Sequence, residues 1–119
     1  MKRTLIIGAS PNTSRYANKA AFRLVNVGHK IVNIGIKKGE VAGEKILNGQ
    51  PQIQNLDTIA LYIGPKNQEH LYEYIISLKP KRIIFNPGTE NDELIAFANK
   101  NNIEPVLGCT LVMLASKTY

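Results

Sequence analysis

Near its start the chain reads TLIIGASPNTSR over residues 4–15. The first part is a short apolar run that ends at a glycine, which is typical of a buried strand. From residue 14 onward, small and apolar residues recur at helical spacing until Gly28, and this pattern predicts a helix over residues 14–28. The polar residues 8–15 are therefore expected to form a turn that joins a first strand to a first helix.

The rest of the chain repeats this alternation of apolar runs and helical patterns. Further strands are predicted at residues 31–34, 58–63, 82–85 and 104–107. Helices are predicted at residues 68–78, 92–101 and 110–115. The polar stretch 35–55 predicts a long connection with one short helical turn around residues 44–47.

Apolar strands that alternate with helices are typical of a parallel sheet covered on both faces. The right-handed crossover rule then leaves chiefly a Rossmann-like or a flavodoxin-like strand order. We predict an α/β fold, a single Rossmann-like domain over residues 1–119, with a five-stranded parallel sheet and helices on both faces.

Composition limits the class of protein and its partners. The chain is 44% apolar and 20% charged, as in an ordinary globular domain. Its net charge of +6 is spread along the chain without interleaved aromatic residues, which argues against nucleic-acid binding and suits a phosphorylated small ligand. No apolar run is long enough to span a membrane or to form a signal peptide, so we expect no membrane association and a cytoplasmic location. One cysteine excludes an internal disulfide, and no residues show metal-ligand spacing.

The turns that follow the predicted strands hold most of the unusual Gly, Pro and Asn residues. In such a sheet these turns share one edge, where ligands bind. The first helix stands out because it has no acidic residue, since the first acid in the chain is Glu40, and because Arg15 and Lys19 lie in its first turns. A helix N-terminus attracts anions, and side-chain donors are added by Ser10, Asn12, Thr13 and Ser14. Residues 8–15 are therefore predicted to bind phosphate.

The type of phosphate compound depends on the second strand. The dinucleotide motif G-x-G-x-x-G is absent, since only Gly8 is present. The acidic residue that binds the NAD ribose is replaced by Lys37 and Lys38. Two lysines suit a ribose with an extra phosphate, as in coenzyme A (CoA) or NADP.

The chain resembles the small stand-alone CoA-binding proteins, which are similar to the CoA-binding N-terminal domain of the succinyl-CoA synthetase α-subunit. The matching segments span nearly the whole chain: 6–12 with Arg15 and Tyr16, 24–32, 43–46, Gly64-Pro65 and Asn86-Pro87-Gly88. The resemblance implies a Rossmann-like domain that binds CoA or an acyl-CoA. It implies phosphate contacts from Gly8, Ala9, Ser10, Asn12 and Arg15, adenosine contacts from Ile36 and Lys37, and a further loop lined by Pro65 and Asn67. This chain departs from the family at the exit of the third strand, so the resemblance assigns no ligand contact to Lys66.

Evidence for catalysis is weak in the sequence. No acid–base pair falls on the predicted ligand edge, and His29 and His70 are expected outside it. Cys109 follows the last strand, where a helix N-terminus favours the thiolate, and one interpretation is a mixed disulfide with the CoA thiol. A small buried residue is the simpler interpretation. We expect a CoA-binding module without catalysis of its own. The alternatives are an NADP-linked reductase, a CoA-ligase fragment that needs a partner chain, or an interaction module with a vestigial site. The apolar C-terminal residues 112–114 suit either a core or a homodimer face.

Overall fold

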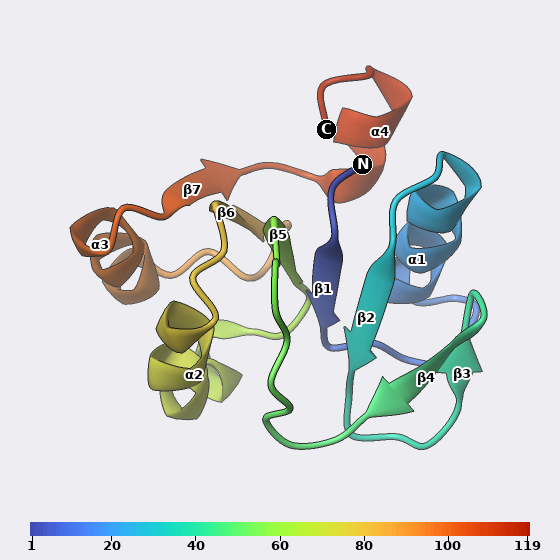
Figure 1. Cartoon of the computed structure of the whole chain (residues 1–119), viewed down its shortest axis with the longest axis horizontal. Helices are drawn as coiled ribbons and strands as arrows, with labels where there is room; N and C mark the ends of the chain where they lie inside the picture. Colours follow the sequence, from blue (N-terminus) through green and yellow to red (C-terminus); the bar gives the residue numbers. More distant parts are fainter.

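A computed structural model describes all 119 residues, and one sheet runs through the middle of the molecule (Figure 1). Its seven strands lie in the order β3-β4-β2-β1-β5-β6-β7. The strands are β1 (Thr4–Ile7), β2 (Ile31–Ile34), β3 (Glu40–Val41), β4 (Glu44–Leu47), β5 (Thr58–Leu61), β6 (Arg82–Phe85) and β7 (Glu104–Leu107). The helices are α1 (Tyr16–Asn26), α2 (Tyr72–Ser77), α3 (Asp92–Lys100) and α4 (Thr110–Ala115), and two 3-10 turns, η1 (Pro65–Asn67) and η2 (Glu69–Leu71), precede α2.

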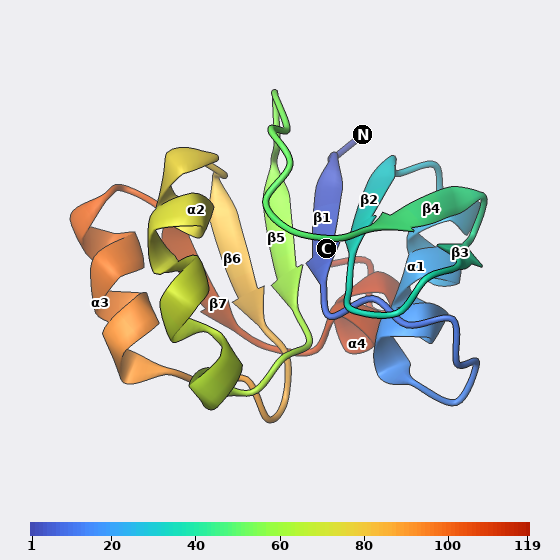
Figure 2. The same cartoon turned by 90° about the horizontal axis from the view of Figure 1, so that it is seen from below.

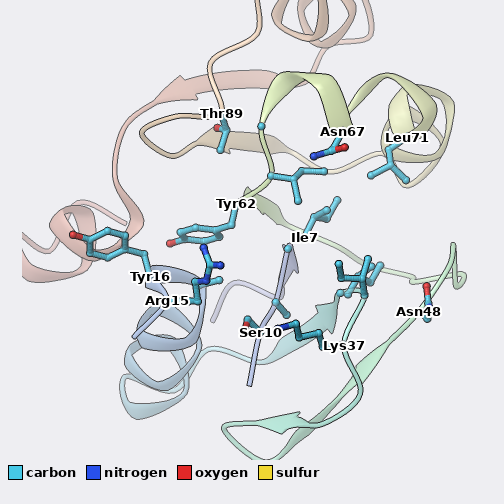
Figure 3. Close-up of a pocket in the computed structure, with 18 of the residues that line it drawn as sticks. Ile7, Ser10, Arg15, Tyr16, Lys37, Asn48, Tyr62, Asn67, Leu71 and Thr89 are labelled. Atoms are coloured by element: carbon cyan, nitrogen blue, oxygen red, sulfur yellow. The ribbon is translucent and has the colours of Figure 1, made fainter. Parts of the chain in front are cut away.

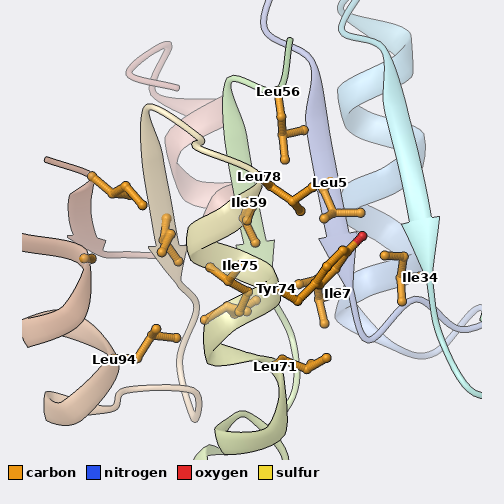
Figure 4. Close-up of a cluster of buried hydrophobic side chains, with 14 of the residues drawn as sticks. Leu5, Ile7, Ile34, Leu56, Ile59, Leu71, Tyr74, Ile75, Leu78 and Leu94 are labelled. Atoms are coloured by element: carbon orange, nitrogen blue, oxygen red, sulfur yellow. The ribbon is translucent and has the colours of Figure 1, made fainter. Parts of the chain in front are cut away.

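Helices cover both faces of the sheet, as predicted (Figure 2). On the face of α2 and α3, Leu5 and Ile7 of β1 pack with Ile75 in the larger apolar core (Figure 4). On the face of α1 and α4, Ile6 packs with Ala21 in a smaller core. Successive residues of a strand point to opposite faces, so the fully buried β1 contributes to both cores.

The prediction of a five-stranded, wholly parallel sheet is wrong, because the sheet has seven strands and one antiparallel pair. All neighbouring pairs are parallel except β3 and β4, which form an antiparallel hairpin at the edge beside β2. The helical turn expected around residues 44–47 is strand β4. Val41 and Ile46 are buried here and their charged neighbours are exposed, while Ala42 and Gly43 both have positive φ, as a tight two-residue hairpin requires. The buried Asn33 of β2 secures the hairpin by donating to the carbonyls of Val41 and Glu44 at 3.1 Å each.

The connection from β4 to β5 contains no helix. Residues 48–57 run across the α2 face of the sheet instead, and Ile53 and Leu56 bury their side chains in the larger core. The hydroxyl of Tyr74 in α2 donates to the Pro51 carbonyl at 2.5 Å, which anchors this segment. None of the helices has the length and apolar character needed to cross a bilayer.

Candidate functional site

A cavity of about 630 Å³ lies at the carboxyl edge of the sheet (Figure 3). Its lining comes from the turns after β1, β2, β4, β5 and β6, which meet at this edge because the strands are parallel. The structure brings nine of the predicted site residues into the lining: Gly8, Ala9, Ser10, Arg15, Ile36, Lys37, Asn67, Pro87 and Gly88.

The other predicted residues lie outside the lining. Asn12 and Ser14 shape the turn before α1, since the Asn12 side-chain oxygen accepts from the Ser14 N–H at 3.0 Å and from the Ser14 hydroxyl at 2.8 Å. Lys38 and Pro65 are exposed neighbours of lining residues. Cys109 is half-buried just before α4.

Asn86 is buried and has a structural position between three elements. Its amide donates to the Leu61 carbonyl at the end of β5 at 2.9 Å. Its side-chain oxygen accepts from the N–H and the hydroxyl of Thr110, at 2.8 and 3.0 Å, where α4 begins. Only 2% of this residue is exposed, so Asn86 joins β5, β6 and α4 below the cavity and offers no surface to a ligand.

The β1–α1 turn, residues 8–15, uses its N–H groups unevenly. The N–H groups of Gly8 and Ala9 both donate to the Ile34 carbonyl at 2.9 Å, so they are occupied within the fold. The N–H groups of Ser10, Thr13, Tyr16 and Ala17 have no hydrogen-bond acceptor in the protein. The free N–H groups therefore begin at Ser10, after Gly8 and Ala9, and continue into the first turn of α1.

The amino-terminal end of α1 lacks the features that normally neutralise it. Its N-cap residue is Arg15, whose side chain makes no capping bond, and its first turn contains no acid. By contrast, α3 is capped by the side chain of Asn91, which accepts from two N–H groups, and Asp92 and Glu93 follow. Acids near a helix N-terminus are stabilising and cations are not. Because α1 has no acid or side-chain cap there, the partial positive charge of this end favours a bound anion.

Close backbone contacts hold this turn in place. Gly8 has a φ of +101°, and a Cβ there would lie 3.0 Å from the Tyr62 carbonyl. At Gly35 a Cβ would lie only 2.2 Å from the Ala9 carbonyl oxygen, so any side chain would push the turn off the end of β2. The Asn18 amide also donates to the Ser10 carbonyl at 2.9 Å, tying the turn to α1. The free N–H groups thus have fixed positions.

The opposite wall of the cavity is held by Gln68. This fully buried side chain donates to the carbonyls of Ile63 and Thr89, at 3.0 and 2.8 Å, and so joins the turns after β5 and β6. Tyr62 lies between this wall and α1, and burial raises the pKa of its phenol to about 12. The Tyr62 hydroxyl is buried and has no hydrogen-bond partner.

The cavity lining contains no Asp or Glu, and its charged or titratable side chains are Arg15, Lys37, His70, Tyr16 and Tyr62. Its field therefore favours an anion. The sequence interpretation placed His70 outside the site, but the 3-10 turn η2 brings it to the cavity edge. Asn48, Gly49 and Gln50 also line the cavity, and the sequence does not predict them because the preceding strand β4 was expected to be a helical turn.

His29 lies outside the cavity lining and accepts a hydrogen bond from the Lys2 N–H at 3.0 Å. No group of His, Cys and acidic residues is placed to hold a metal ion.

Comparison with solved structures gives several matches. An uncharacterized protein has 58% sequence identity and a TM-score of 0.98, with coverage of 100% of this chain and 98% of that chain. A Thermus thermophilus protein, cell-free ID.343, has 16% identity and a TM-score of 0.87 and covers 99% and 90%. The dinucleotide forming acetyl-coenzyme A synthetase 1 of Ca. Korarchaeum cryptofilum, in complex with phosphate and ADP, has 16% identity and a TM-score of 0.70; the match covers 92% of this chain and 26% of that chain. At these lower identities the likeness concerns the fold alone.

No curated protein matches the chain. A family model, described as a CoA binding domain, matches residues 2–115. This confirms the resemblance inferred from the sequence, and the chain belongs to the CoA binding domain family.

Proposed function

We propose that this protein binds CoA or an acyl-CoA and holds the diphosphate at the amino-terminal end of α1. The observation that carries the proposal is the set of four N–H groups without acceptors beside Arg15, in a cavity without a carboxylate. Hydrogen bonds to charged groups are worth about 1.5–3 kcal/mol each, so a few of these donors suffice to fix a diphosphate. Membership of the CoA binding domain family supports CoA as the phosphate compound.

The adenosine end of the ligand is assigned to the turn after β2. Ile36 is 90% exposed although it lines the cavity, and an apolar side chain held in water at a cavity edge suits the face of a base. Lys37 is the adjacent cation and is assigned to the 3′-phosphate that distinguishes CoA from dephospho-CoA. No acidic residue lines this side, which disfavours the free ribose hydroxyls of NAD.

Binding without catalysis is the simplest function for this cavity. General acid–base chemistry on a thioester needs a positioned base, and His70 supplies the only imidazole in the cavity lining. It is exposed on η2, and no hydrogen bond orients its imidazole. Cys109 is outside the lining, so covalent catalysis by its thiolate has no geometric support.

Titration calorimetry with CoA, dephospho-CoA, NADP and NAD tests this proposal. We expect CoA to bind most tightly, with dephospho-CoA about threefold to fivefold weaker, because an ion pair at an exposed lysine contributes up to about 1 kcal/mol. NAD is expected to bind weakest. A preference for NADP over CoA would favour the reductase alternative, and no binding of any of the four would favour a vestigial site.

A further inference from the structure

The cavity covers a limited length of the sheet edge. Its ends are marked by Asn48, after β4, and by Thr89, after β6, while the turn after β7 contributes no lining residue. The strand order between these ends is β4-β2-β1-β5-β6, which makes four spacings of about 4.8 Å, or about 19 Å in all.

The diphosphate position proposed above divides this length in half. The free N–H groups follow β1, which is the middle strand of the five that line the cavity. Two strands remain on either side, so the cavity extends about 10 Å from the phosphates in each direction.

The pantetheine arm of CoA is longer than this. Thirteen bonds separate the phosphorus from the sulfur, through pantoate, β-alanine and cysteamine units, which is the bond count of slightly more than four peptide residues. At the spacing of an extended chain the arm reaches about 15 Å. An arm extended along this edge therefore carries the sulfur past the end of the cavity, whichever side the adenosine takes. With adenosine beside Ile36 and Lys37, the arm leaves past Gly88 and Thr89.

We infer that the protein encloses the nucleotide end of its ligand and leaves the sulfur, with any acyl group on it, outside the cavity. This inference rests on the proposed function. The ligand class is then free CoA together with acyl-CoAs of different chain lengths, bound with little discrimination. A thioester held in this way is open to attack by a second protein, whereas an enclosed thioester is not.

Two measurements test the inference. In calorimetry on the wild-type protein, CoA, acetyl-CoA and hexanoyl-CoA are expected to bind within about threefold of one another. A difference of tenfold or more between them would overturn the inference and leave CoA binding intact. Failure of all three compounds to bind would overturn the proposed function and the inference with it.

The second measurement follows the reactivity of the CoA thiol toward an aromatic disulfide reagent. The experiment uses the Cys109→Ser variant, which has no protein thiol that could react with the reagent. Because Cys109 lies outside the cavity lining, this substitution leaves the lining unchanged. Bound CoA is expected to react within about threefold of the rate of free CoA. Protection by tenfold or more at saturating protein would show that the sulfur is enclosed.

Discussion

Replacing Arg15 with Asp should stabilise the free protein and weaken CoA binding at the same time. Arg15 is the N-cap of α1, with φ −77° and ψ 141°, and it makes no capping bond. Aspartate is a preferred N-cap, which contributes about 0.5–2 kcal/mol, and a negative charge at this end adds about 0.3–1 kcal/mol. We therefore expect the free energy of unfolding to rise by about 1–2 kcal/mol.

For a chain of 119 residues, an unfolding entropy of about 2.1 cal/mol/K per residue converts this gain into a Tm increase of about 4–8 °C. CoA binding should weaken at least about tenfold, or about 1.4 kcal/mol, because a cation beside the diphosphate becomes an anion. Differential scanning calorimetry of the free protein and titration calorimetry with CoA measure the two effects separately.

Arg23→Asp is the matched control, since Arg23 lies in the last turn of the same helix and the change in net charge is identical. An acid at a helix C-terminus is unfavourable, so this variant should lose about 1 kcal/mol of stability or less. Its CoA affinity should stay within about twofold of wild type. If Arg15→Asp lowers the Tm, or if both variants weaken CoA equally, the end of α1 is not an anion site.

Three further changes separate binding from stability. Lys37→Gln should weaken CoA binding about threefold to fivefold and leave dephospho-CoA binding unaffected, whereas Lys38→Gln should change neither, because Lys38 lies outside the cavity lining. Equal effects of the two variants in calorimetry would remove the assigned 3′-phosphate contact. The Tyr62 phenol loses its proton at about pH 12 when folded and near pH 10 when unfolded, so the unfolded state binds fewer protons between these values and stability should fall by up to about 1.4 kcal/mol per pH unit there. Denaturant unfolding of Tyr62→Phe should lack this part of the alkaline loss, and an unchanged pH dependence would contradict the burial of the hydroxyl. Asn86→Ala should lower the free energy of unfolding by about 2–4 kcal/mol, because the buried N–H of Thr110 loses its acceptor. A change below about 1 kcal/mol in the same assay would argue against a stabilising role for the Asn86 hydrogen bonds.

The alternation of strands and helices could be predicted because each element has a strong local pattern. Strands β1, β5 and β6 are apolar after their first residue, which is Thr4, Thr58 and Arg82 respectively. Gly28 ends the first helical pattern within two residues of the last residue of α1. The β3–β4 hairpin was missed because its two short strands contain Glu and Lys at positions that also suit a helix. Its partner strand β2 and the buried Asn33 select the strand conformation, and neither effect is local.

The ligand edge was predictable in outline, whereas its free donors were not. The acid-free start of α1 and the Gly-Pro and Pro-Gly turns are visible in the sequence. Which N–H groups stay free depends on the Ile34 carbonyl of the neighbouring strand, which accepts hydrogen bonds from the N–H groups of both Gly8 and Ala9. Similarly, His70 reaches the cavity because the predicted helix begins with 3-10 turns, whose different period changes the direction of its side chains.

Chemical-shift mapping of the backbone amides on a ¹⁵N-labelled sample, titrated with CoA, reports directly where the phosphates lie. The amides of Ser10, Thr13, Tyr16 and Ala17 should show the largest changes on saturation, because their N–H groups gain charged acceptors. Those of Gly8 and Ala9 should change less, since both already donate to Ile34. Saturable binding with the largest changes elsewhere, and with these four amides unmoved, would contradict a diphosphate site at the start of α1.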